Sequence, residues 1–177
     1  MDNNCPSSFF KEIKGGFYIM GYIYAFDLSL SCVGTTIFSN DAKSILITSV
    51  ETKSEKLHQM KLKIIADYML NLRDRYKPEF IIVEGGFSRF NASTQAIYKC
   101  HGVCQYLFND VPQVFYPPST VKKVVGGKGN MKKDELRQIV ENKCNAHFSN
   151  NDESDSYAVG LCYFIKEDLI KWKVESG

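Results

Sequence analysis

The sequence has 177 residues, a size that suits one compact domain. Hydrophobic residues make up 44% of it and charged residues 24%, which excludes disordered, collagen-like and coiled-coil chains. The formal net charge of +2 is too small to mark a nucleic-acid-binding protein by itself, so any site for a polyanion has to come from a local cluster of basic residues.

The first 17 residues are polar, and we predict that they form an N-terminal extension to a single domain at 18–177. The apolar run from Phe17 to Phe26 is about half of the roughly 20 residues that a membrane-spanning helix needs. It also lacks the small-residue cleavage pattern of a secretory signal. The six cysteines are scattered without a dense framework, which indicates reduced thiols. We therefore expect a cytoplasmic protein with no membrane partner.

The first half of the chain predicts an antiparallel meander followed by a helix and a central strand. Three apolar runs give the strands of the meander, at 22–26, 33–39 and 44–50, and Asn40-Asp41 supplies a hairpin turn. Apolar residues then recur at helical spacing over 55–75. The next strand, 80–83, is wholly apolar, which is typical of a sheet centre covered on both faces.

The second half predicts helices around one further strand. Helical spacing returns over 96–108, and a strand follows at 113–116. Pro117 and Pro118 open the next helix, with Ser119 as its capping residue, and the glycines from Gly126 onward end it. Two more helices are expected, at 132–144 and 154–171. This order predicts an α/β fold with a mixed five-stranded sheet covered by helices on both faces.

Acidic residues stand where this fold collects ligands. Asp27 and Glu84 each follow an apolar strand, and ligands of open α/β sheets bind outside the carboxyl ends of the strands. Asp152 and Asp155 are three residues apart and share one face of a helix start. Carboxylates crowded into one cleft need a cation, and Mg²⁺ or Mn²⁺ suits carboxylate and water ligands best. Taken singly, the same residues also suit helix caps or turns.

A lysine-rich stretch follows at 121–133. It carries no acid, and its glycines allow backbone N–H groups to approach an anion closely. It does not match the Walker A pattern, and a solvated surface loop is the alternative interpretation. The candidate phosphate contacts are Lys122, Lys123, Lys128, Lys132 and Lys133.

An aromatic segment lies just past Glu84. Phe87 and Phe90 flank Ser88-Arg89, where the rings are able to stack on an exposed base and Arg89 to contact DNA. The alternative for these phenylalanines is packing in a lid or in the core.

These residues together resemble the RuvC-type Holliday junction resolvases of the RNase H-like superfamily. The resemblance runs from about Tyr22 to Phe164. Its best-matched segment is the strand 80–83 with Glu84-Gly85-Gly86-Phe87. The stretch 124–133 is similar to the family's Val-Val-Gly-x-Gly loop and downstream lysine, and Asp152-x-x-Asp155 to its C-terminal pair of acids.

The resemblance implies a role for each matched residue. Asp27, Glu84, Asp152 and Asp155 become metal-binding catalytic acids, Lys133 the basic residue near the scissile phosphate, and Phe87 the aromatic near the junction centre. It further implies two Mg²⁺ ions per site, a homodimer that cuts two opposed strands of a four-way junction, and no nucleotide cofactor.

One departure concerns the residues after the first acid. The cellular enzymes usually have Pro-Gly there, whereas Leu28-Ser29-Leu30 follows Asp27. This variant looks closer to viral or phage branches of the family and leaves the selectivity for four-way junctions open.

Three other functions compete with a resolvase. A ribonuclease H or a less selective branched-DNA nuclease has the same fold, and a non-catalytic nucleic-acid-binding module needs none of the acids. A sugar-kinase-like or actin-like ATPase shares the meander, but it needs glycine-rich phosphate turns and a second lobe. A zinc site at Cys100, His101 and Cys104 lacks a convincing fourth ligand, so we expect these cysteines to pack in the core.

Overall fold

The computed structural model describes residues 21–86 and 92–173. Its strands are β1 (Tyr22–Leu28), β2 (Cys32–Ser39), β3 (Ser44–Glu51), β4 (Pro78–Glu84) and β5 (Gln113–Tyr116). Its helices are α1 (His58–Arg75), α2 (Ala92–Leu107), α3 (Pro118–Gly126), α4 (Lys133–Cys144) and α5 (Asn151–Lys166).

The five strands form one mixed sheet in the order β3-β2-β1-β4-β5. β1, β2 and β3 pair antiparallel as a meander, whereas β4 pairs parallel with both β1 and β5. The apolar run predicted for the sheet centre is β4, in which Ile81, Ile82 and Val83 are fully buried. The predicted α/β fold class is confirmed.

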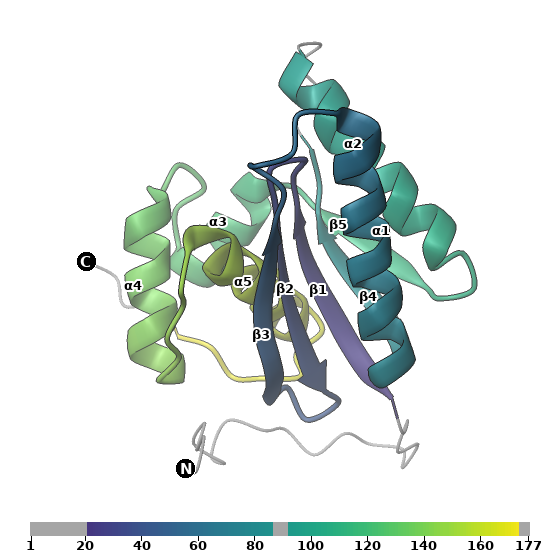
Figure 1. Cartoon of the computed structure of the whole chain (residues 1–177). Helices are drawn as coiled ribbons and strands as arrows, with labels where there is room; N and C mark the ends of the chain where they lie inside the picture. The colour runs from purple at the N-terminus through teal and green to yellow at the C-terminus, as the bar shows by residue number, and fades with distance from the viewer. Residues whose placement is uncertain (1–20, 87–91, 174–177) are drawn as a thin grey trace.

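Helices cover both faces of the sheet, α1 and α2 on one face and α3, α4 and α5 on the other (Figure 1). Alternate residues of a strand point to opposite faces, and β1 divides its side chains accordingly. Tyr24, Phe26 and Leu28 pack with α1 and α2, while Ile23 and Ala25 pack with α3, α4 and α5. Each face therefore has its own apolar core.

Several predicted helix boundaries were wrong. The first helix begins at His58, not at residue 55, and the second begins at Ala92, not at residue 96. Ser119 does not cap α3, because the N-cap is Pro117 and makes no side-chain hydrogen bond. The last helix runs over Asn151–Lys166 rather than 154–171: Asn150 caps its start, and the chain turns back through Asp168, whose φ of 56° leaves the helical conformation.

Other sequence predictions concern features outside the fold. The N-terminal extension 1–17 lies outside the described residues. Among the described helices, none is long and apolar enough to cross a membrane. None of the described cysteines forms a disulfide, and Cys100 and Cys104 of α2 are buried in the core, as expected.

Candidate active site

Strand register brings the first two acids side by side. Phe26 of β1 pairs with Val83 of β4, so that Asp27 and Glu84 follow at the same level of two parallel strands. Asp27 follows Ala25 by two residues, and Glu84 follows Ile82 by two. Residues two apart in a strand point to the same face, so both acidic side chains point to the α5 face of the sheet, where Ala25 and Ile82 pack. The two carboxyl groups lie close enough for the charge of Asp27 to raise the pKa of Glu84.

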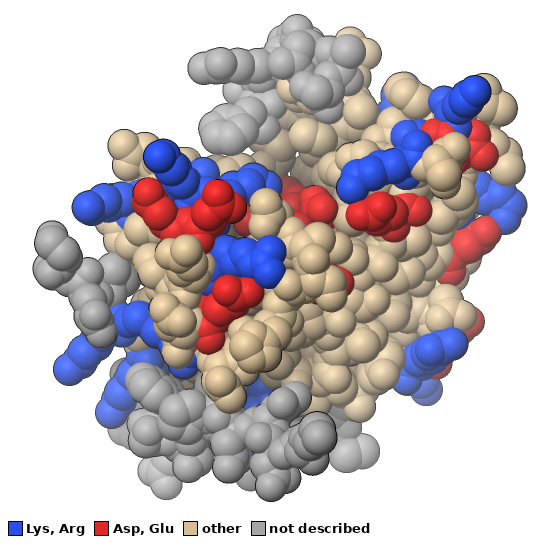
Figure 2. Space-filling view, turned by 60° about the vertical axis from the view of Figure 1, so that its left-hand side comes forward, with Lys and Arg blue, Asp and Glu red and all other residues tan. Residues whose placement is uncertain are grey.

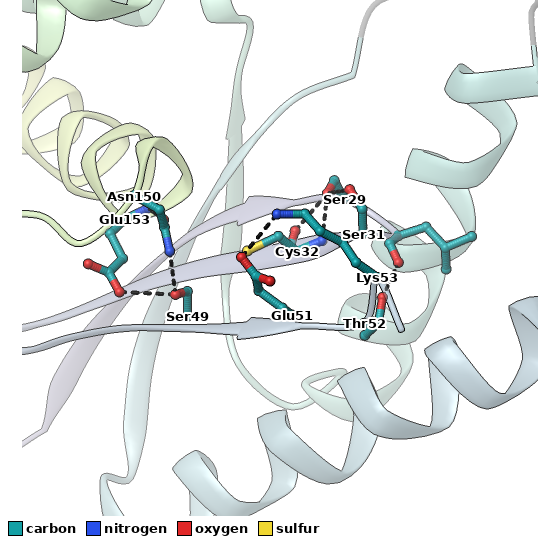
Figure 3. A network of polar contacts seen from close by, with 10 residues as sticks. Ser29, Ser31, Cys32, Ser49, Glu51, Thr52, Lys53, Asn150 and Glu153 are labelled. Atoms are coloured by element: carbon teal, nitrogen blue, oxygen red, sulfur yellow. Dashed lines mark hydrogen bonds and ion pairs between the residues drawn. The ribbon is translucent and has the colours of Figure 1, made fainter. Parts of the chain in front are cut away.

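The start of α5 is fixed by its own polar residues. The Asn150 side chain accepts a hydrogen bond from the Glu153 amide at 2.9 Å, and Glu153 in turn accepts one from the Ser149 amide at 2.8 Å. Ser49 of β3 joins both side chains, donating to Glu153 and accepting from Asn150 (Figure 3). Glu153 is therefore a capping residue, and the helix start is tied to the sheet.

Gly34 lets the helix start come close to the sheet. It pairs with Asp27 across β1 and β2, and a Cβ on Gly34 would collide with the main-chain carbonyl of Asp152. A side chain at position 34 would therefore push α5 away from β1. This contact brings the first turn of α5, with Asp152, beside the strand that carries Asp27.

Three of the four predicted acids line one cavity of about 250 Å³. Asp27 and Glu84 enter it from the sheet and Asp155 from α5, while Lys122 of α3 and Lys133 of α4 line it as well. Five sequence-distant segments thus contribute charged side chains to one concave site, which is the geometry expected of a reaction centre.

Crowding of the acids raises their pKa values. Burial, followed by the negative charge of Asp155, raises the pKa of Asp27 to about 7. Burial and the charge of Asp27 raise the pKa of Glu84 to about 8. Lys133 acts in the opposite direction on both carboxyl groups. Three carboxylates in this cavity therefore need a proton or a cation among them.

Lys133 is the nearest positive charge to the acids. It donates a hydrogen bond to Asp155, whose side chain is only 6% exposed. Burial opposes the charged form of Lys133, but the bond to Asp155 and the nearby acids prevail and raise its pKa to about 12. The lysine therefore stays charged at neutral pH.

Asp152 lies beside the cavity without lining it. It interacts with the thiol of buried Cys32 and, after burial, is the main reason why the pKa of that thiol rises to about 12. Glu51 and Lys53, which pair with each other at 3.0 Å, lie on the same side (Figure 3). Asp152 is still near enough to raise the pKa values of Asp27 and Asp155.

The donor set suits a hard divalent cation. Among the described residues, no three acidic, histidine or cysteine side chains already stand in a chelating arrangement, and Asp155 is paired with Lys133. The partly buried Asp27 and Glu84 nevertheless lie close enough for the charge of Asp27 to raise the pKa of Glu84, a repulsion that an oxygen-binding cation relieves. The cavity fits Mg²⁺ or Mn²⁺ through carboxylate oxygens.

The other residues predicted to contact DNA lie partly at the cavity and partly outside it. Lys122 lines the cavity, whereas Lys123, Lys128 and Lys132 are exposed outside it. The face drawn in Figure 2 carries acidic and basic side chains next to each other rather than a field of one sign. Phe87, Arg89 and Phe90 lie outside the described residues.

Two residues beside the site were missed from the sequence. Gly34 has no local signal, since its role depends on a helix 118 positions later in the chain. His101 is 6% exposed and contacts the main chain of Glu84. From the sequence, its spacing from Cys100 and Cys104 indicated only an incomplete zinc site. The available signal was a polar residue next to the apolar face of a predicted helix, because a buried polar side chain usually has a hydrogen-bond partner.

Comparison with known proteins gives the family. The family model of the crossover junction endodeoxyribonuclease RuvC matches residues 23–163. The RuvC of Christiangramia forsetii is 28% identical over 127 residues, which are 68% of this chain and 65% of the relative. The RuvC of Pseudothermotoga lettingae is 23% identical over 164 residues, 90% of this chain and 95% of the relative.

A solved structure agrees in fold. The Thermus thermophilus RuvC in complex with a Holliday junction substrate superposes with a TM-score of 0.70 at 19% identity, covering 85% of this chain and 98% of that one. The matched stretch 23–163 includes β1, β4, the lysine-rich stretch and the acids of α5. The chain belongs to the RuvC family of crossover junction endodeoxyribonucleases.

Proposed function

We propose that the cavity at the carboxyl ends of β1 and β4 is the active site of a divalent-metal-dependent endonuclease that cuts four-way and related branched DNA. One observation carries the assignment of the site: Asp27, Glu84 and Asp155 line a single cavity together with two lysines. Membership of the RuvC family makes the chain a Holliday junction resolvase by class.

The acids are proposed to hold the metal. Asp27 and Glu84 offer oxygens from the sheet, Asp155 offers them from α5, and Asp152 stands next to them on the same helix. Two Mg²⁺ ions held by these acids would supply an activated water and would stabilise the charge that develops on the leaving oxygen. The raised pKa values of Asp27 and Glu84 mean that protons leave these carboxyl groups when the cation enters.

The lysines are proposed to handle the phosphate. Lys133 keeps a positive charge at the cavity, where negative charge develops on the phosphate during cleavage. Lys122 faces the same cavity from α3. The exposed Lys123, Lys128 and Lys132 are proposed to contact the backbone of a DNA arm beside it.

A homodimer is proposed as the working unit. A four-way junction has two-fold symmetry, and cutting two opposed strands requires two cavities. Light scattering should therefore give twice the chain mass. A monomer that still makes paired cuts would contradict this part of the proposal.

The experiment that tests the function uses labelled DNA of one sequence in three forms: a four-way junction, a Y-shaped molecule and a linear duplex. Each is incubated with the full chain and Mg²⁺, or with chelator. Symmetrical cuts in the junction that disappear in chelator support a resolvase. Equal cutting of the Y form or the duplex indicates a less selective nuclease, and binding without cleavage a non-catalytic module.

A further inference from the structure

A buried histidine lies beside the end of β4, on the same helix that brings Ile97 to the cavity. His101 of α2 is 6% exposed, and its ring packs against Phe115 of β5 with centroids 5.6 Å apart. A Cβ built on Gly86 would lie 3.9 Å from its Cε1 atom. The ring therefore stands against the segment Glu84–Gly86, where β4 ends.

The contact with Glu84 is made to its main chain. The His101 ring lies close to the Glu84 main chain in a contact that favours the protonated ring, as expected of a ring N–H that faces a carbonyl oxygen. Among the described residues, Nε2 of His101 is buried and has no hydrogen-bond partner. We therefore assign the contact with the Glu84 carbonyl to Nδ1.

The ring is enclosed by apolar and aromatic neighbours. Burial lowers the pKa of His101, while its contact with the Glu84 main chain acts in the opposite direction. Cys100 and Cys104 of the same helix turn into the apolar core, so they form no ligand set with this histidine. Its one polar contact among the described residues is with the strand end that carries Glu84.

We propose that His101 is a positioning residue: its Nδ1–H holds the Glu84 carbonyl from the α2 side and thereby fixes the direction in which the Glu84 carboxylate enters the cavity. A carboxylate needs fixed geometry to bind a small cation such as Mg²⁺, and residues that orient metal ligands commonly change metal affinity about 10- to 100-fold when removed.

This inference rests on the proposed metal site, and its test separates the two. Three variants of His101 differ in the position at which a hydrogen-bond donor remains in the side chain. His101→Asn places an amide N–H close to the position of Nδ1, His101→Gln places it close to Nε2, and His101→Leu has none. Cys100→Ala is the matched control, because it removes a buried neighbour on the same helix that faces the core.

Two measurements are made on each full-length folded protein. The first is the rise in melting temperature as Mg²⁺ is added without DNA, which gives the Mg²⁺ midpoint without any need for activity. The second is the Mg²⁺ concentration for half-maximal cleavage of a four-way junction. Melting curves without metal identify any variant that has lost its fold.

We expect His101→Asn to keep both midpoints close to those of the unaltered protein. His101→Gln and His101→Leu should raise both by about tenfold or more. Cys100→Ala should melt at a lower temperature with both midpoints unchanged, since a merely structural defect does not alter the metal site.

Midpoints that stay the same in all variants, or that rise equally in His101→Asn and His101→Leu, would overturn the positioning role. An unaltered protein that shows neither a Mg²⁺-dependent melting shift nor cleavage would instead overturn the metal site itself, and the inference with it.

Discussion

Gly34 of β2 and Asp152 of α5 meet backbone to backbone, so closely that position 34 has no room for a side chain. Because Gly34 also pairs with Asp27, this contact sets how near the acid of β1 lies to those of α5. The geometry of the site thus depends on an approach between a strand and a helix as well as on the acids themselves.

Gly34→Ala should therefore destabilise the protein. Its Cβ meets main-chain atoms of Asp152, which cannot move aside as a flexible side chain can, and overpacking of this kind costs about 1–3 kcal/mol. Urea unfolding measures the decrease in stability. Gly102→Ala is the control: apart from its own helix turn, no atom of the described residues lies within 4 Å of a Cβ at this position in α2, so the change should stabilise the helix by about 0.5–1 kcal/mol. Equal stability of the two variants would contradict this explanation.

Lys133→Met should slow cleavage. The variant loses the ammonium group that pairs with Asp155 at the cavity, and removing one preorganised charge or donor of this kind typically costs about 10²–10³ in rate. Single-turnover cleavage at saturating junction measures it. Lys132→Met, the exposed neighbour, should weaken junction binding with little effect on that rate. A Lys133→Met rate equal to that of the unaltered protein would remove this lysine from the reaction.

Stabilisation by Mg²⁺ should increase with pH. The folded-state pKa values of Asp27 and Glu84, about 7 and about 8, lie above their usual values, so the metal-free native state binds more protons than the unfolded chain. The stability that these protons contribute is complete below about pH 4 and is lost as the pH rises toward 8. Mg²⁺ competes with them, so the melting shift that it causes should be small at pH 5.5 and large at pH 8.5. A shift independent of pH would argue against these two acids as ligands.

The exposed lysines of the loop between α3 and α4 should contribute to the salt dependence of junction binding. On duplex DNA, each lysine–phosphate interaction contributes about 0.9 to the slope of log affinity against log salt. Lys128→Ala with Lys132→Ala should therefore flatten the slope by about 1.8 if both lysines bind duplex arms. Lys63→Ala on α1, where Lys63 pairs with Asp67, is the control and should leave it unchanged. An unchanged slope in the double variant would mean that these lysines face away from DNA.

The sequence predicts the strands and the candidate acids better than the contacts between them. The strand 113–116 is confirmed to the residue, because an apolar run bounded by turn residues depends on local signals. The predicted start of α5 is three residues late, although Asn150 and Glu153 form a capping pattern that is readable in the sequence. The end of that helix depends on packing of the returning chain, which no local pattern shows.

For the candidate site, the sequence predicted the acidic residues but not the contacts that position them. Asp27, Glu84 and Asp155 were expected together and share the cavity, while Asp152 faces Cys32 beside it. The close approach at Gly34 and the contact of His101 with the Glu84 main chain join segments far apart in the chain. Their importance comes from tertiary structure, so residue type and spacing alone did not reveal them.

The central claim is that Glu84 belongs to a catalytic metal site, and Glu84→Gln tests it most directly. The change keeps the shape of the side chain and removes its charge. Two quantities are measured on folded protein with an unaltered melting temperature: junction affinity in Ca²⁺ and single-turnover cleavage in Mg²⁺. Glu135→Gln on α4, an exposed glutamate that does not line the cavity, serves as the control.

We expect Glu84→Gln to bind the junction at least as tightly as the unaltered protein, because a negative charge near the phosphate backbone is gone. Its cleavage rate should fall by about three orders of magnitude, since metal stabilisation of the transition state is worth several kcal/mol and each 1.36 kcal/mol is tenfold. Glu135→Gln should cleave normally. Near-normal cleavage by Glu84→Gln would contradict the account and remove Glu84 from the active site.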